Sequence, residues 1–133
     1  MTIIWLIRHA ESTANAGAVT HDPSSSPLTD QGWQQARLLA EEFKCAPDLI
    51  ISSPFLRTIQ TAAPTRTRFY QVPYEIWPIQ EFTYLDPASG VGTTVAQRKA
   101  RVTAYWQQQD PSYKDGKGAE SFSQMLARVR TML

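Results

Sequence analysis

Cysteine is nearly absent from this sequence, since Cys45 is the only one among 133 residues. A single thiol excludes an internal disulfide and is typical of a protein kept in a reducing cytoplasm. No window approaches the roughly 20 apolar residues of a membrane-spanning helix. No basic region followed by a long apolar stretch opens the chain, as it would in a signal peptide. We therefore expect a cytoplasmic protein without a membrane partner.

Charge of either sign is also sparse. The formal net charge is +1, and no block of like charges occurs. Nucleic-acid-binding surfaces need clustered basic residues, so no nucleic-acid partner is predicted. Clusters of histidine, cysteine and carboxylate residues with metal-ligand spacing are missing as well, and no metal site is predicted. Histidine occurs only at His9 and His21, and nothing after His21 resembles a second catalytic imidazole.

The chain does contain enough apolar sequence for one compact domain. Apolar residues make up 42% and aromatic residues 11% of the chain, which has a length typical of a single domain. Short apolar runs alternate with helical periodicity, which predicts a three-layer α/β/α domain over 1–133 with a mainly parallel central sheet. The predicted strands cover 2–8, 48–53 and 74–79, and the predicted helices cover 30–44, a stretch after Ser53-Pro54, 93–109 and 119 to the terminus.

The most informative segment follows the first predicted strand. Arg8 and His9 stand at the carboxyl end of that strand, before the polar turn that begins at Ala10. In open α/β sheets, ligands bind at this edge. A guanidinium group holds phosphate through paired hydrogen bonds, and a neutral imidazole can act as a nucleophile and carry a covalent intermediate. The pair predicts a phosphoryl-transfer site, whereas His21 in its polar loop is expected to be a surface residue.

Several segments, taken in order, resemble the phosphoglycerate-mutase-like branch of the histidine phosphatase superfamily. The family opening Arg-His-Gly-Glu-Ser/Thr is matched from Arg8, with Ala10 in place of glycine and Asn15 following. The other matching segments are Leu28-Thr29-Asp30-Gln31-Gly32, Gln35-Ala36, Ser53-Pro54-Phe55-Leu56-Arg57-Thr58, Glu81 and Ala119-Glu120-Ser121-Phe122. The likeness covers essentially the whole chain and implies the phosphoglycerate-mutase-like fold.

The resemblance implies a role for each of five residues. His9 would be the nucleophile that becomes phosphorylated. Arg8 and Arg57 would bind the non-bridging phosphate oxygens, and Asn15 would add a hydrogen bond. Glu81 aligns with the family's general acid and base, which protonates the leaving oxygen and then activates water. Since the guanidinium charges would stabilise the anionic transition state, the resemblance implies neither a metal ion nor another cofactor.

The chain departs from the family pattern at its end. Family members carry a second histidine in a Ser-His-Gly-like segment after a further strand, and this sequence stops at the helix that normally precedes that strand. Three explanations stay open: a domain truncated at its C-terminus, which is favoured, a degenerate family member, or completion by another chain. In the family that strand lies beside the first one, so its absence would expose the edge that carries Arg8-His9. An exposed apolar edge favours association, which makes a homo-oligomer one expected state.

Three functions remain open at this stage. The first is a phosphomonoester hydrolase that acts through phosphohistidine on a small phosphorylated substrate. The second is a phosphotransferase of the phosphoglycerate mutase type, and the third is a catalytically inactive phosphate-binding or interaction module. The short spacing between Glu81 and Glu120 favours hydrolysis, because mutases of the family tend to carry an insertion after the acid. The missing second histidine supports the inactive module.

Overall fold

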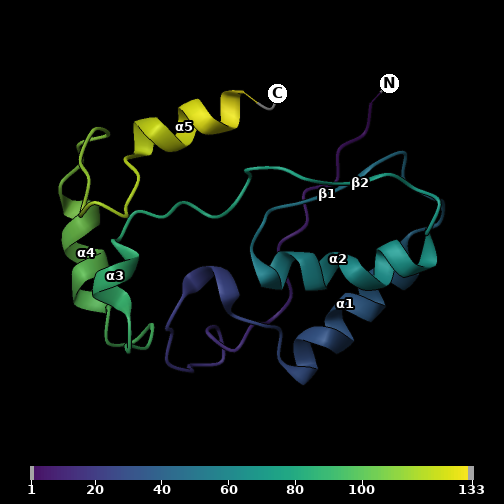
Figure 1. Cartoon of the computed structure of the whole chain (residues 1–133), viewed down its shortest axis with the longest axis horizontal. Helices are drawn as coiled ribbons and strands as arrows, with labels where there is room; N and C mark the ends of the chain where they lie inside the picture. The colour runs from purple at the N-terminus through teal and green to yellow at the C-terminus, as the bar shows by residue number, and fades with distance from the viewer. Residues whose placement is uncertain (1, 132–133) are drawn as a thin grey trace.

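The computed structural model describes residues 2–131 (Figure 1). Its elements in chain order are η1 (Pro23–Ser25), α1 (Asp30–Glu42), β1 (Ile50–Ser52), α2 (Leu56–Arg68), β2 (Tyr74–Ile76), α3 (Pro87–Gly90), α4 (Lys99–Gln107) and α5 (Phe122–Arg130). One side of the molecule holds α1, α2 and the two strands, and the other side holds α3, α4 and α5. An extended segment at 77–84 joins the two sides and carries Glu81.

The two strands form a parallel ladder. Ile50 lies opposite Tyr74 and Ser52 lies opposite Ile76. The helix α2 connects the strands and packs against α1 (Figure 1). A strand, a helix and a parallel strand in succession are what the sequence predicts for this stretch, because parallel strands need a crossover connection. The α/β class with a parallel sheet is therefore confirmed.

The apolar run at 2–8 is not a strand. Its side chains are largely exposed, by 70% at Ile3 and by 94% at Leu6, and Trp5 stacks on Phe43 with the ring centroids 5.2 Å apart. The run pairs with neither β1 nor β2. Hydropathy indicates a tendency to be buried, whereas a strand forms only where a neighbour satisfies its backbone groups. The predicted buried strand is therefore wrong for residues 2–8.

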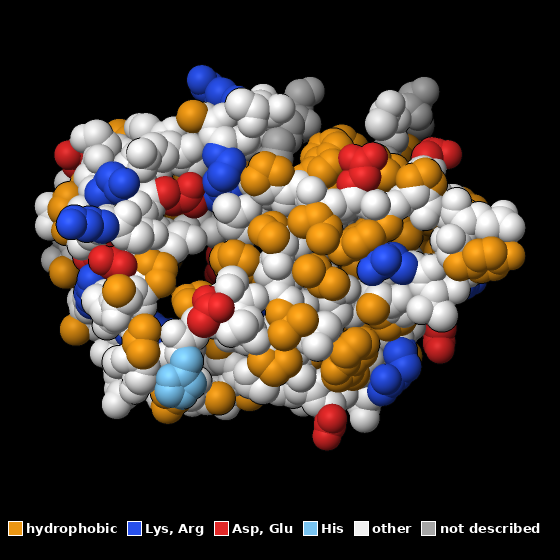
Figure 2. All heavy atoms as spheres, in the orientation of Figure 1, with side chains coloured by type: hydrophobic (Ala, Val, Ile, Leu, Met, Phe, Trp, Pro, Cys, Tyr) orange, Lys and Arg blue, Asp and Glu red, His pale blue; other side chains and the backbone are white. Residues whose placement is uncertain are grey.

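Hydrophobic side chains remain visible on the surface around this sheet. Figure 2 shows them gathered over the half of the molecule that holds β1, β2 and α2. The exposed large apolar residues include Ile4, Ile7 and Ile76. An apolar surface of this kind is the feature that a further layer of structure or a partner would cover.

Side-chain caps determine where two of the helices begin. The Thr29 hydroxyl accepts a hydrogen bond from the backbone of the first turn of α1, so this helix begins as predicted. Ser121 and Gln124 form a reciprocal capping box at the start of α5. This box places the helix start at Phe122 rather than near 119. The sequence therefore predicted both helices but placed the second start too early.

The helix predicted at 93–109 begins later, at Lys99. Thr93 does not cap it, because its backbone takes part in a bridge with the loop at Thr20. The Thr20 N–H donates to the Thr93 carbonyl at 3.0 Å, and the Gly92 N–H donates to the Thr20 carbonyl at 3.0 Å. This long-range contact ties the loop after His9 to the α3–α4 side, and local sequence gives no sign of it.

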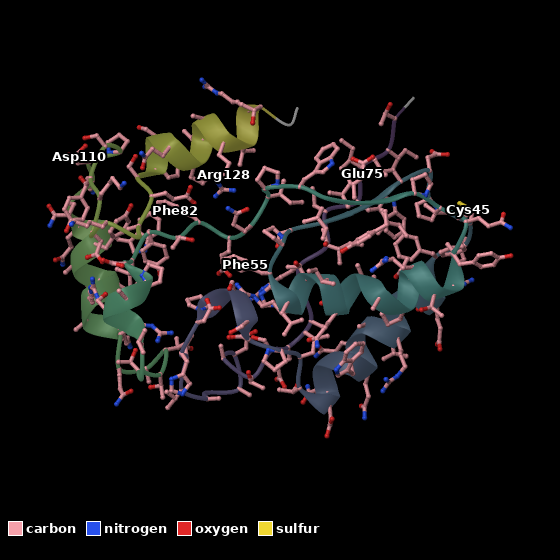
Figure 3. The ribbon with its side chains drawn as sticks, viewed as in Figure 1. Cys45, Phe55, Glu75, Phe82, Asp110 and Arg128 are labelled. Atoms are coloured by element: carbon pink, nitrogen blue, oxygen red, sulfur yellow. The ribbon has the colours of Figure 1, made fainter. Side chains whose placement is uncertain are left out.

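Five aromatic rings form the centre of the α3–α5 side. We call them the aromatic cluster: Phe82, Tyr84, Tyr105, Trp106 and Phe122, with neighbouring centroids 4.9 to 6.4 Å apart. Burial raises the pKa of Tyr105, so its phenol stays protonated at neutral pH. Phe82 follows Glu81 directly and lies between α4 and α5 in Figure 3. The aromatic cluster therefore fixes the chain one residue beyond the predicted acid.

Candidate active site

His9 lies where the chain leaves the apolar run. The imidazole is half-buried, and its Nδ1 atom lies 2.7 Å from the backbone oxygen of Ala10. A carbonyl oxygen can only accept a hydrogen bond, so Nδ1 carries the proton and donates it. In the neutral ring, Nε2 then keeps its lone pair. The arrangement provides the tautomer that can attack through Nε2.

Thr61 connects the backbone beside His9 to α2. The Ala10 N–H donates to Thr61 Oγ1 at 3.0 Å, and this hydroxyl donates to the Arg57 carbonyl at 2.6 Å. Both Ala10 and Thr61 are buried. The hydroxyl therefore ties the segment beside His9 to the helical turn that begins at Arg57. The sequence analysis missed Thr61, although its i+4 spacing from Arg57 places the two on one helix face.

Replacing Thr61 with valine tests this connection. The variant keeps the shape of the side chain but leaves the buried Ala10 N–H without its acceptor, which typically costs about 1–3 kcal/mol. We expect the free energy of unfolding in urea to fall by that amount and the Ala10 amide to lose hydrogen-exchange protection. Thr67→Val is the matched control, since the Thr67 hydroxyl bonds the Ala63 carbonyl on the exposed side of the same helix. Equal effects of both variants would remove the special role of Thr61.

Asn15 closes the turn after His9. Its Oδ1 atom accepts hydrogen bonds from the Ser12 backbone N–H at 3.1 Å and from the Ser12 hydroxyl at 2.7 Å. Ser12 is buried, while Asn15 is exposed. The amide oxygen therefore stabilises the turn, and only the amide nitrogen of Asn15 has the donor chemistry to bind a phosphate oxygen.

Glu11 and the start of α1 hold the other side of this turn. The Thr29 N–H donates to the Glu11 carbonyl at 3.0 Å, and the Thr29 hydroxyl lies 2.6 Å from the Glu11 carboxylate. Gly32 makes the close approach of helix and turn feasible, because a Cβ atom there would lie 2.0 Å from the Glu11 carbonyl oxygen. Glycine is thus required at this position by the contact with the backbone of the turn.

The Gly32→Ala variant should accordingly be less stable than the natural chain. Overpacking of this kind costs about 1–3 kcal/mol, against a gain in helix propensity of up to about 1 kcal/mol. We expect a lower midpoint of urea denaturation and altered amide signals at Glu11. Gln34→Ala, at an exposed position of α1, is the control for helix propensity alone. An unchanged or raised midpoint for Gly32→Ala would contradict the close contact.

Arg57 and Glu81, predicted as phosphate ligand and acid, lie against each other. Arg57 is only 7% exposed, although it is charged. One Nη atom donates to the Pro23 carbonyl at 2.6 Å and the other to the Glu81 carboxylate at 2.6 Å. The Glu81 side chain is 69% exposed. The guanidinium is therefore held by a partly buried carbonyl on one side and by a largely exposed carboxylate on the other.

The short helix η1 presents the carbonyl that Arg57 binds. Asp22 caps η1 by accepting hydrogen bonds from the Ser24 hydroxyl and N–H at 2.6 and 2.9 Å. These bonds lower the pKa of Asp22, so the cap stays ionised at neutral pH. Phe55, labelled at the start of α2 in Figure 3, stacks on Arg57 with the guanidinium carbon 4.8 Å from the ring centroid. The guanidinium is thus restrained by an aromatic ring as well as by hydrogen bonds.

Within residues 2–131, neither Arg8 nor His21 forms a hydrogen bond or ion pair with Arg57 or Glu81. Arg8 is exposed, and within residues 2–131 its side chain forms no ion pair. His21 is exposed, as expected, and borders a cavity of about 80 Å³ with Pro23, Asp86 and Arg98. The buried Thr20 hydroxyl at this cavity has no hydrogen-bond partner within the described part of the chain.

Residues 2–131 contain neither a cluster of metal ligands nor a membrane-spanning helix. No group of three or more histidine, cysteine, aspartate or glutamate side chains there could hold a metal ion. No helix in the same range is long and apolar enough to cross a membrane.

Known proteins give this geometry a family context. The sequence model of the histidine phosphatase superfamily (branch 1) matches residues 4–133. The adenosylcobalamin/alpha-ribazole phosphatase of Salmonella typhi is 26% identical over 144 aligned residues, which cover 98% of this chain and 66% of that protein. A phosphoglycerate mutase-like protein of Arabidopsis thaliana is 42% identical over 71 residues, which cover 44% of this chain and 26% of that protein.

A solved structure agrees with these sequence matches. The alpha-ribazole phosphatase of Shigella flexneri superimposes with a TM-score of 0.71 at 25% identity, covering 95% of this chain and 62% of that one. The chain therefore spans 66% of the length of the Salmonella phosphatase and 62% of the Shigella structure. Because the family pattern extends over nearly every residue and the fold is shared, the chain belongs to the histidine phosphatase superfamily.

Proposed function

We propose that this chain carries the phosphoryl-accepting machinery of a phosphomonoester hydrolase, with His9 as the nucleophile. The hydrogen bond from His9 Nδ1 to the Ala10 carbonyl supports this most strongly, because it leaves Nε2 with the lone pair that the reaction needs. Since Thr61 ties Ala10 to Arg57, the nucleophile and a phosphate-binding cation are held by one helix. The family membership supports the same reaction class.

The proposed reaction has two steps. His9 Nε2 attacks the phosphorus, the P–N bond forms, and the bond to the leaving oxygen breaks while Glu81 gives that oxygen a proton. Glu81 then takes a proton from water, whose oxygen attacks the phosphohistidine, and inorganic phosphate leaves as Nε2 is restored. A general acid and base of this kind contributes about 10²–10⁴-fold to the rate. Arg8, Arg57 and the amide nitrogen of Asn15 would bind the non-bridging oxygens.

Because Arg57 and Glu81 form an ion pair, substrate binding to Arg57 would also release Glu81. A phosphate oxygen would replace the Glu81 carboxylate on Arg57, because both are anionic acceptors for the same Nη atom. The released carboxylate would then take a proton from solvent and, as the neutral acid, give that proton to the leaving oxygen. Exposed carboxylates are weakly held, so the exchange costs little.

The setting we propose is a cytoplasmic enzyme for a small phosphorylated molecule, without a nucleic-acid partner. The lone Cys45 and the net charge of +1 support this setting. The exposed apolar run at 2–8 supports self-association as a homo-oligomer. The charge-stabilising groups in the proposed mechanism are guanidinium groups, so it requires no metal ion.

A trapped phosphoenzyme tests the proposal. The chain is mixed with p-nitrophenyl phosphate, quenched in alkali, in which phosphohistidine survives, and digested for mass spectrometry. We expect one added phosphoryl group on the peptide that contains His9, together with release of inorganic phosphate. Vanadate binding without phosphoenzyme or turnover would instead support the inactive phosphate-binding module. Transfer of phosphate between two positions of phosphoglycerate without net release would support a mutase, the activity class named for the Arabidopsis relative.

A further inference from the structure

Glu81 stands on a segment with no regular secondary structure. Residues 77–84 are extended and join the two sides of the molecule (Figure 1). The Glu81 carboxylate is largely exposed. Its partner Arg57 belongs to α2, on the side of the molecule that holds α1 and the two strands. A general acid must nevertheless be held within hydrogen-bond reach of the leaving oxygen. Contacts from outside this segment must therefore supply that placement.

An ion pair at α5 makes such contacts on both flanks of Glu81. Arg128 donates to the Glu120 carboxylate through Nε at 3.1 Å and also through Nη2. The other Nη atom of Arg128 donates to the Pro78 carbonyl at 2.6 Å and to the Gln80 carbonyl at 3.3 Å. Figure 3 shows Arg128 extending from α5 toward this segment. One guanidinium thus joins Glu120 to the chain just before Glu81.

Glu120 binds the chain just after Glu81. Its carboxylate accepts a hydrogen bond from the Thr83 N–H at 3.2 Å, and its own N–H donates to the Thr83 carbonyl at 2.9 Å. The Glu120 and Arg128 side chains are only 20% and 16% exposed. Ion pairs as sheltered as this are screened less by solvent than surface pairs. The contacts therefore restrain backbone groups on both sides of the acid.

We propose that the Glu120–Arg128 ion pair is the positioning device for the acid Glu81. It fixes the carbonyls at 78 and 80 and the Thr83 N–H, while the Glu120 backbone N–H holds the Thr83 carbonyl, so that the Glu81 side chain projects toward Arg57. Neither Glu120 nor Arg128 touches the reacting atoms. This role rests on the proposed function of Glu81, and the experiment below separates the two.

Glu120→Gln is the test variant, and Asp115→Asn is its matched control. Asp115 forms the other sheltered ion pair of the α3–α5 side, with Arg101, and accepts a hydrogen bond from the Asp86 N–H rather than from residues 78–83. Both changes convert a partly buried, ion-paired carboxylate into its amide. A loss of general stability is therefore common to both variants, whereas misplacement of Glu81 is expected only in Glu120→Gln.

The kinetic readout is the dependence on leaving group. Nitrophenolate leaves without a proton, whereas an alkoxide needs one from the acid. We expect Glu120→Gln to lower the rate of phosphoenzyme formation, measured in a single turnover, about tenfold or more for an alkyl phosphate and by less than about twofold for p-nitrophenyl phosphate. Asp115→Asn should leave the ratio of the two phosphoenzyme-formation rates as in the natural chain. An equal loss for both substrates, or no loss, would overturn the positioning role.

A second readout needs no turnover. The NMR signals of the Arg57 guanidinium report whether Glu81 is still paired with it. We expect these signals to shift in Glu120→Gln and to stay unchanged in Asp115→Asn. If the natural chain releases no phosphate, the proposed function fails, while a shift confined to Glu120→Gln still supports the placement of Glu81. Unchanged Arg57 signals in Glu120→Gln would overturn the inference by themselves.

Discussion

Replacing His9 with alanine should abolish phosphate release from p-nitrophenyl phosphate and the phosphoenzyme with it. Loss of the nucleophile in a covalent mechanism typically costs at least about a thousandfold in rate, because no other group can form the intermediate. The fold should survive, since the half-buried imidazole makes a single hydrogen bond, to Ala10, worth about 1 kcal/mol. The measurement is initial-rate kinetics on folded protein, with circular dichroism as the check on structure.

The second histidine provides the control for this experiment. His21→Ala changes an exposed side chain on the loop beside η1 and leaves the His9 ring and its hydrogen bond in place. We expect His21→Ala to keep the phosphoenzyme and a rate within a few-fold of the natural chain. Turnover that persists in His9→Ala, or that disappears equally in both variants, would remove His9 as the nucleophile.

Replacing Arg57 with alanine should weaken the binding of vanadate or phosphate about ten- to hundredfold. Hydrogen bonds to charged groups are worth about 1.5–3 kcal/mol, and each 1.4 kcal/mol is tenfold in affinity. The effect should be large because Arg57 is buried and its guanidinium is oriented by the Pro23 carbonyl before any ligand binds. Isothermal titration with vanadate measures the change directly.

Arg66 offers a matched control for the change in charge. It lies on the same helix, and its guanidinium carbon stacks 3.6 Å from the centroid of the Tyr74 ring, away from Glu81. Arg66→Ala removes one positive charge as Arg57→Ala does, so it should lower vanadate affinity only slightly at moderate salt. Equal affinities in the Arg57→Ala variant and the natural chain would exclude Arg57 as a phosphate ligand.

The fold could be predicted where local chemistry decides it. The helix α1 begins after its Thr29 cap as expected, and β1 and β2 lie within their predicted runs. The run at 2–8 has the same apolar character as β1 but no neighbouring strand, and hydropathy cannot distinguish the two cases. The start of α4 was misplaced for a related reason, because Thr93 pairs with Thr20, far away in the sequence.

The functional side chains of the candidate site could be predicted, whereas the groups that orient them could not. Arg57 and Glu81 carry side chains whose chemistry is visible in the sequence, and the structure brings them together. The groups that orient them are backbone carbonyls and amides, such as the Pro23 carbonyl and the Thr83 N–H. Every residue type offers these groups, so no sequence pattern identifies them. The aromatic cluster was not predicted, because ring contacts depend on tertiary packing.

The hydrogen bonds of Thr61 also bear on how the site fluctuates. A tilt or sliding of α2 carries Arg57 with it, and through the Thr61 hydroxyl it carries Ala10 and the adjoining imidazole in the same direction. The separation between Arg57 and His9, the proposed nucleophile, should therefore change little during such motions. The backbone on both sides of Glu81 is held to α5 instead, while the Glu81 carboxylate is paired with Arg57. Relative motion of α2 and α5 would thus strain the one ion pair that bridges them, between Arg57 and the segment carrying Glu81, rather than the Thr61 hydrogen bonds.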